Sequence, residues 1–338
     1  MDDSSPDWPG VRLHVVTGKG GTGKTTVAAA LALTLASLGR KVLLAEVEGR
    51  QGISQAFDVA PLPDEEKLVL RVSSGGEVWG LSVDAKAALL EYLEIFYRLG
   101  RAGSALERMG AIDFATTIAP GVRDVLLIGK VYEAARRRRD GKDSGPWVYD
   151  AVVLDAPPTG RVANFLNVND EVAELAKVGP IRNQADSITR LLRSGAAVVH
   201  LTTLLEDMPV QETLDAVGDL ERIKVPLGAF IVNQARPEIL SEDLSADLLR
   251  PGGLTEGFEA QVEHAMASAL GDTGAGAGAD LLAEAADHAV RLELEDRLLR
   301  DLEAHGSALY VLPHLADESG PGRVRTLAQH LAEQAVWT

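Results

Sequence analysis

The chain has 338 residues, 46% of them hydrophobic, so it can bury a large core as one α/β domain or as one domain with an insertion. Its formal charge of −17 opposes nonspecific adhesion to nucleic acid or to an anionic membrane surface. The chain contains no cysteine, which excludes disulfides, thiolate zinc sites and iron–sulfur clusters.

Residues 1–10 are acidic and contain prolines, without the basic-then-apolar order of a secretory signal, and we expect them to form a disordered tail. The longest apolar run, residues 27–38, is interrupted by Thr34 and falls well short of the roughly 20 residues that span a bilayer. We therefore expect a soluble, cytoplasmic protein.

A glycine-rich stretch, residues 18–26, separates a short β-rich run from an uninterrupted helix-forming segment. Glycines at such a turn let successive N–H groups point at phosphate oxygens, and the positive end of the helix adds its field. The pattern predicts a phosphate-binding loop in which Lys24 reaches the β- and γ-phosphates and the Thr25 hydroxyl binds a bridging magnesium ion. The residues predicted to bind ATP here are Gly18, Gly20, Gly21, Thr22, Gly23, Lys24, Thr25 and Thr26.

Two further predicted strands end in acidic residues. Residues 41–45 lead into Glu46 and Glu48, and residues 149–154 lead into Asp155. Because α/β sheets place chemistry at the carboxyl ends of their strands, Asp155 is the candidate for holding magnesium, and Glu48 for orienting or deprotonating the attacking water. A solvated surface glutamate is the alternative for Glu48, and an aspartate that caps the next turn is the alternative for Asp155.

Strands continue to alternate with helical stretches along the chain, as a parallel sheet requires. The other predicted strands are residues 78–84, 197–203, 227–232 and 309–312, and a long acidic helix is predicted over 280–305. Residues 11–338 are therefore expected to form a single α/β domain of the phosphate-loop NTPase type. We predict a doubly wound, mainly parallel sheet with a helical insertion at about 85–145.

Two parts of this predicted insertion have more than one interpretation. Residues 89–99 carry apolar side chains on nearly all sides, which indicates either packing within the insertion or a nucleotide-dependent contact surface for a client. The four arginines at 136–139 indicate either a nucleic-acid contact or, as we expect on a chain this acidic, a solvated helix end that complements the helix dipole.

Lys19 gives the loop a second lysine, and its spacing alone leaves open where the side chain goes. The loop resembles that of the deviant Walker A ATPases, which reads Lys-Gly-Gly-x-Gly-Lys-Thr and whose extra lysine reaches across a dimer interface to the partner's phosphates. This resemblance implies that Lys19 acts in trans, as an arginine finger does. Because the chain has one such loop and no internal repeat, it implies a homodimer or a heterodimer with a paralogous subunit.

Within that class, the chain resembles the family of the arsenite-efflux ATPase ArsA and of the ATPases that deliver tail-anchored membrane proteins, and especially actinobacterial anion-transporting ATPase-like proteins. Residues 48–57, Glu-Gly-Arg-Gln-Gly-Ile-Ser-Gln-Ala-Phe, resemble the family's first switch, Asp-Pro-Ala-His-Asn-Leu-Ser-Asp-Ala-Phe. Residues 156–161, Ala-Pro-Pro-Thr-Gly-Arg, resemble its second switch, Thr-Ala-Pro-Thr-Gly-His. Glu48 stands in place of the catalytic aspartate, and Gln51 and Arg161 stand in place of histidines.

The same resemblance implies three further nucleotide contacts. The amide of Gly160, in the second switch, would contact the γ-phosphate and release it after hydrolysis. Asn233, which follows the strand at 227–232, matches the family's adenine pocket, and its amide can both donate to and accept from the base edge. A plain turn is the alternative for this residue. Pro313 lies where the family closes over the adenine.

The resemblance implies a nucleotide-gated dimer that hydrolyses ATP with Mg²⁺ and moves a helical subdomain to handle a client, in transport or in membrane-protein targeting. The client would be an unidentified protein or membrane component. We expect no nucleic acid and no zinc, since the chain is acidic and lacks the family's zinc-binding cysteine pair. A metalloid pump subunit would need soft ligands such as thiolates, which the chain lacks. The alternative is a small-molecule phosphotransferase of the same class, which would leave phosphate on a metabolite.

Overall fold

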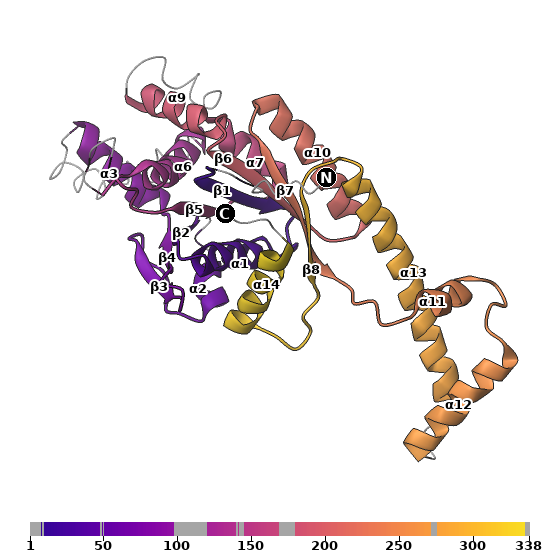
Figure 1. Cartoon of the computed structure of the whole chain (residues 1–338). Coiled ribbons are helices and arrows are strands. Elements are labelled where there is room, and N and C mark those ends of the chain that lie inside the picture. Colours follow the sequence, from indigo (N-terminus) through magenta and orange to yellow (C-terminus); the bar gives the residue numbers. More distant parts are fainter. Residues whose placement is uncertain are drawn as a thin grey trace.

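A computed structural model describes residues 8, 10–47, 49, 51–97, 120–139, 141, 145–168, 180–271 and 276–334. Within these ranges, an eight-stranded sheet lies at the centre and helices cover both of its faces (Figure 1). The strands are β1 (Leu13–Gly18), β2 (Lys41–Glu46), β3 (Lys67–Arg71), β4 (Glu77–Ser82), β5 (Ala151–Asp155), β6 (Ala197–Thr203), β7 (Leu227–Ala235) and β8 (Leu309–Pro313). The helices are α1 (Lys24–Ser37), α2 (Gly52–Phe57), α3 (Ala85–Tyr97), α6 (Pro120–Arg136), α7 (Thr159–Leu166), α9 (Pro180–Leu192), α10 (Asp207–Ile223), α11 (Glu242–Leu249), α12 (Glu256–Leu270), α13 (Ala277–Glu303) and α14 (Gly320–Gln334).

The sheet has the strand order β3-β4-β2-β5-β1-β6-β7-β8, and among these described strands only the β3–β4 pair is antiparallel. This confirms the predicted α/β, mainly parallel fold. In the register of the central strands, Asp155 of β5 stands beside Glu46 of β2 on one side and Val16 of β1 on the other. The loop that follows β1 and the acidic ends of β2 and β5 therefore meet at one edge of the sheet.

The two faces of the sheet carry separate apolar cores. Along β1, Leu13 and Val15 enter the core beneath α6, α7, α9 and α10, whereas Val16 enters the core beneath α1, α2 and α14. Helix α1 is buried continuously from Val27 to Ala36, because it lies between the sheet and α14. Burial from both sides explains why its sequence is apolar all round.

Strand β3 was not predicted from the sequence. It is a five-residue edge strand whose ends, Lys67 and Arg71, are exposed, and its pairing with β4 shifts register between Leu68 and Leu70. A short, charged and irregular edge strand carries almost no periodic signal. Strand β7 also runs further than predicted, so Asn233 lies within the strand and not after it.

Helices α11, α12 and the outer part of α13 project from the sheet as an arm (Figure 1). Helices α11 and α12 contain no buried residue, and each begins with a side-chain cap, from Ser241 and Thr255 respectively. The Glu263 carboxylate accepts hydrogen bonds from the backbone N–H groups of Gly276 (2.6 Å) and Gly278 (2.9 Å), which joins α12 to the start of α13. The predicted acidic helix is α13, but α11 and α12 were not predicted.

The described part of the predicted insertion contains α3 and α6, which pack against each other. Residues 98–119, most of the predicted tail and the side chains of residues 92–97 lie outside the described part of the chain. The insertion's boundaries therefore stay a prediction. No described helix is both long enough and apolar enough to cross a bilayer.

The arginines after α6 are held in place and do not form the freely solvated helix end that was expected. The helix stops at Arg136. Arg137 pairs with Glu66, Arg138 donates to the Gly145 carbonyl oxygen (2.7 Å), and Arg139 donates to the Trp147 carbonyl oxygen (3.0 Å). These contacts fasten the end of α6 to the segment that leads into β5.

Candidate nucleotide-binding site

The loop between β1 and α1 has the curled backbone that the glycines predict. Gly21 (φ 93°) and Gly23 (φ 83°) are both in the left-handed region, which side chains other than glycine's disfavour. The N–H and the hydroxyl of Thr22 both donate to the Lys19 carbonyl oxygen, at 3.3 and 2.9 Å, and close the curl. Lys24 is the first residue of α1, at the positive end of that helix.

Packing requires two of the loop glycines independently of any phosphate. A Cβ atom on Gly18 would lie 2.0 Å from the Thr202 carbonyl oxygen, and one on Gly23 would lie 2.4 Å from Asn233 Nδ2. Strands β6 and β7 therefore press directly against the loop. Sequence reasoning assigned these glycines to phosphate contact alone, because nothing local reveals which strands lie behind them.

Thr25 and Asp155, predicted as magnesium ligands, lie in contact. Thr25 Oγ1 donates a 2.6 Å hydrogen bond to Asp155 Oδ2. Both groups present hard oxygen atoms, which Mg²⁺ prefers, and Mg²⁺ is commonly held by one or two carboxylates together with substrate phosphates. This donor set, at the mouth of the phosphate loop, fits a magnesium ion.

Glu46, at the end of β2, organises the first switch. Its carboxylate is buried and accepts hydrogen bonds from the backbone N–H groups of Gln51 (2.9 Å) and Ile53 (3.2 Å) and from the Ser82 hydroxyl (3.0 Å). Because the first two donors belong to the start of α2, Glu46 caps that helix. Glu48, the predicted water-activating residue, lies outside the described residues.

Gln51, which replaces a family histidine, fastens the first switch to a neighbouring loop. Its side chain donates from Nε2 to the Leu62 carbonyl oxygen (3.1 Å) and accepts at Oε1 from the Leu62 N–H (2.7 Å). The next residue, Gly52, lies so close to Thr25 that a Cβ atom there would stand 2.8 Å from Thr25 Cγ2. The first switch therefore packs directly on a predicted metal ligand.

The second switch leaves the sheet beside the phosphate loop. The Thr17 hydroxyl of β1 donates to the Pro157 carbonyl oxygen (2.6 Å). Thr159 then begins α7, and Gly160 is exposed with open space where a side chain would be. That space leaves the Gly160 backbone accessible to a phosphate group.

Lys19 pairs within its own chain. Its Nζ atom lies 2.8 Å from Oε1 of Glu212 on α10. The other oxygen of the same carboxylate, Oε2, accepts a 3.5 Å hydrogen bond from the Thr159 hydroxyl. No motif in the sequence singled out Glu212, since it meets the loop only through the tertiary fold.

The residues predicted to bind the base line one small cavity of about 120 Å³. Asn233 and Pro313 lie on its wall together with Gly23 and Thr26. Asn233 also holds the loop, because its Nδ2 atom donates to the Thr22 carbonyl oxygen (2.9 Å). Gln234, whose pairing with Asn233 in sequence matches the Asn-Gln of the family's adenine pocket, also lines the cavity. The remaining lining residues, which the sequence did not connect with the base, are His314, Leu315, Arg323 and Leu327.

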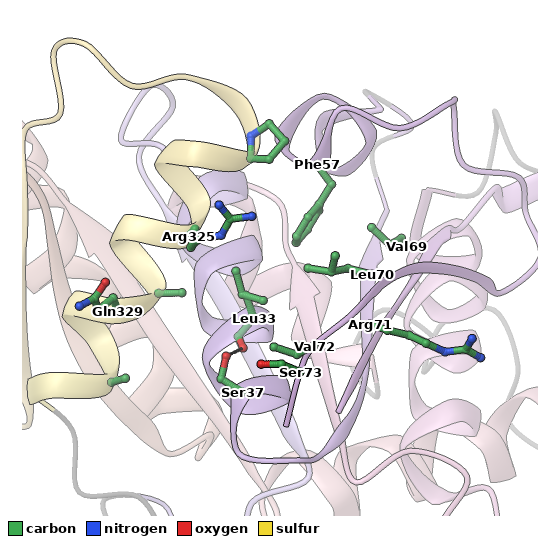
Figure 2. A pocket seen from close by; sticks show the side chains of 13 residues that line it. Leu33, Ser37, Phe57, Val69, Leu70, Arg71, Val72, Ser73, Arg325 and Gln329 are labelled. Atoms are coloured by element: carbon green, nitrogen blue, oxygen red, sulfur yellow. Dashed lines mark hydrogen bonds between the residues drawn. The ribbon is translucent and has the colours of Figure 1, made fainter. Parts of the chain in front are cut away.

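A larger cavity of about 560 Å³ lies elsewhere, between α1, β3 and α14 (Figure 2). Its lining is mainly apolar and includes Leu33, Phe57 and Val69. Figure 2 shows Phe57 pointing into it, whereas Arg71 points away. Since Phe57 is the last residue of α2, the cavity borders the end of the first switch.

Comparison with known proteins gives consistent matches. Residues 11–202 match the model of the family described as anion-transporting ATPase. The ATPase BagA of Mycobacterium tuberculosis is 48% identical over an alignment of 346 residues, which covers 98% of this chain and 97% of that protein. A putative ATPase of Mycobacterium bovis matches to the same extent. A putative arsenical pump-driving ATPase of Aquifex aeolicus is 24% identical over 257 residues, which cover 68% of this chain and 81% of that protein.

Proposed function

The chain belongs to the anion-transporting ATPase family, and from this premise we propose that it is a magnesium-dependent ATPase whose active form is a nucleotide-gated dimer. The membership confirms the resemblance drawn from the loop and the two switches. The observation that carries the proposal is the 2.6 Å contact between Thr25 and Asp155 beside the phosphate loop. It supports Mg–ATP because the two side chains supply adjacent oxygen donors where the β- and γ-phosphates would lie.

In this proposal the chain's own residues bind the nucleotide, orient its phosphates and activate the attacking water. The loop N–H groups and Lys24 bind the phosphates, and Asn233 and Pro313 border the base. Thr25 and Asp155 would hold magnesium, which would neutralise charge on the phosphate oxygens. Glu48 accepts a proton from the attacking water, and the Glu46 cap fixes the start of α2 a few residues away.

The second subunit enters through Lys19. The chain supplies one phosphate loop, so in trans action needs either a second copy or a paralogous subunit. Hydrolysis would relax Gly160 and the first switch and re-aim helical elements that handle a client protein or membrane component. Helix α3 is one candidate for that contact. Its described inner end includes Leu89, which is buried, so the client surface would lie further along the helix.

The proposal is tested by following ATP turnover with ³¹P NMR at several protein concentrations, with Mg²⁺ and with EDTA. We expect ADP and free orthophosphate in equal amounts, a specific activity that rises with protein concentration, and loss of turnover in EDTA. Transfer of phosphate to a metabolite in cell extract, without free orthophosphate, would favour a phosphotransferase. Turnover that is independent of both protein concentration and Mg²⁺ would contradict the proposal.

A further inference from the structure

Glu212 joins two parts of the site that sequence reasoning treated separately. Its carboxylate pairs with Lys19 of the phosphate loop (2.8 Å) and accepts from the Thr159 hydroxyl (3.5 Å), which belongs to the second switch. The Thr159 side chain is buried, whereas the Lys19 and Glu212 side chains are 30% and 38% exposed. The ion pair is therefore accessible enough to open without unfolding the surrounding structure.

This ion pair keeps the Lys19 ammonium group away from the phosphates of a second subunit, where Lys19 is proposed to act. Lys19 cannot reach the phosphates of another subunit while its ammonium group is 2.8 Å from a carboxylate of its own chain. We propose that Glu212 is the residue that holds Lys19 in its own subunit until a nucleoside triphosphate and a second subunit are both present. This inference rests on the proposed in trans role of Lys19.

The negative charge of a bound triphosphate would favour opening of the Lys19–Glu212 ion pair. A bound triphosphate brings several negative charges to the loop that contains Lys19, and like charges at short range repel. The phosphates therefore compete with Glu212 for the ammonium group and also push the carboxylate away. Because the same carboxylate contacts Thr159, its movement would release the residue next to Gly160 at the same moment. Glu212 thus links release of the lysine to the second switch.

The size of the effect follows from the exposure of the pair. Partly exposed ion pairs contribute little, and their loss changes an equilibrium by about two- to fivefold. A contact of this strength delays a step without blocking it. Glu212 is accordingly a positioning residue, since it acts through Lys19 and does not need to touch the reacting phosphate.

The first test measures Lys19 directly in the isolated chain, by mass-spectrometric rates of amine acetylation with acetic anhydride. Glu212→Gln should raise the labelling rate of Lys19 about two- to fivefold, relative to the exposed Lys224 in the same molecule. Glu221→Gln is the matched control, because Glu221 is an exposed acid on the same helix whose side chain makes no hydrogen bond or ion pair with any described residue. An unchanged Lys19 rate in Glu212→Gln, with melting temperature preserved, would overturn the proposal.

The second test follows turnover against protein concentration. Glu212→Gln should lower the concentration that gives half-maximal turnover by a similar factor, with kcat within about twofold of the parent. A loss of kcat would instead place Glu212 in the chemical step and overturn the positioning role. In a Lys19→Ala background, Glu212→Gln should have no further effect. If Lys19→Ala retains full turnover, the in trans function fails, and the labelling rates still decide separately whether Glu212 holds Lys19.

Discussion

Thr25 and Asp155 are 130 residues apart in sequence, yet their side-chain oxygens form a 2.6 Å hydrogen bond where the phosphate loop meets the end of β5. These two oxygen groups come from a helix start and a strand end, so the magnesium site proposed for them would exist only in the assembled sheet. Asp155→Asn should bind ATP in EDTA as the parent does. The gain in ATP affinity on adding Mg²⁺ should be about 10- to 100-fold smaller in the variant than in the parent, the scale of a contact to a charged group. Calorimetry with and without Mg²⁺ measures this.

A matched control is Asp150→Asn, because Asp150 directly precedes the start of the same strand and accepts from the Lys41 N–H. It should leave the Mg²⁺ effect unchanged. Equal losses in both variants would show that the change is structural and not specific to the metal site.

A substitution of Lys24 tests the phosphate-binding part of the site. Lys24→Ala should abolish ATP binding measured by calorimetry, because the loop amides alone would then face the charge of the β- and γ-phosphates. The variant should keep the melting temperature of the nucleotide-free parent. An unchanged affinity would remove Lys24 from the site.

Lys19→Ala should behave differently from Lys24→Ala, because Lys19 is proposed to act at the nucleotide site of the other subunit and not at its own. We expect ATP binding to persist and turnover to fall. Mixing Lys19→Ala with a Glu48→Gln subunit should restore part of the activity, because one of the two mixed sites then has both groups intact. Failure of every mixture to recover activity would contradict action in trans.

Glu46 and Glu48 are two residues apart, and the proposal gives them opposite roles. Glu48→Gln should bind ATP normally and slow hydrolysis by about 100-fold or more, the scale of general-base loss. Glu46→Gln should instead lower the free energy of unfolding by about 1 to 3 kcal/mol. The buried Glu46 carboxylate accepts hydrogen bonds from three donors, and a glutamine side chain keeps only one of its two oxygen acceptors. Denaturant unfolding and single-turnover hydrolysis separate the two, and normal turnover in Glu48→Gln would move the role to another group.

A pair of histidines in the sheet predicts how stability depends on pH. His14 Nδ1 and His200 Nε2 lie 3.0 Å apart on β1 and β6, with both side chains buried beneath Trp8. Burial lowers the pKa of His14 to about 3, with the charge of Arg40 as a smaller cause. Burial, and then the neighbouring His14, lowers the pKa of His200 well below its usual value.

Both histidines have a folded-state pKa below the unfolded value of about 6.5. At any pH between the folded and the unfolded values, the unfolded chain therefore binds more protons than the folded chain. The stability contribution is complete above pH 6.5 and is lost as pH falls below it. From pH 7.5 to pH 5.5, each histidine should cost about 1.4 kcal/mol of unfolding free energy. His14→Gln should reduce the parent's loss over this interval by about that amount in urea titrations. An identical pH dependence in the variant and the parent would contradict the assignment.

Local patterns predicted the parts of the fold whose residues carry their own signal. The glycines of the loop, the apolar run of α1 and the strand that ends in Asp155 each combine composition with a boundary, and all three are present. Glu46 was predicted as a strand-end acid, but its capping role depends on where α2 begins. Glu212 could not be predicted, because its partners Lys19 and Thr159 come from other elements of the chain.

Helices α11 and α12 escaped prediction for a different reason. They bury no residue, although Phe258, Val262 and Met266 of α12 recur at the four-residue spacing of an amphipathic helix. Their capping residues, Ser241 and Thr255, were the available signal. Glycine-rich stretches at 250–255 and 271–279 flank α12 and are typical of flexible connections, so the caps resemble ordinary turn residues.

Helix α13 has a mechanical consequence for the molecule. Its 27 residues extend about 40 Å. The inner part packs against α10, where Arg297 contacts Asp207 at 3.3 Å, and the far part carries α12. Because α10 also carries Glu212, a tilt of α13 at this contact would act on the helix that pairs with the second loop lysine. A tilt of about 5° at the inner end would carry the tip through about 3.5 Å, roughly twice the 1.5 Å rise of one helical residue.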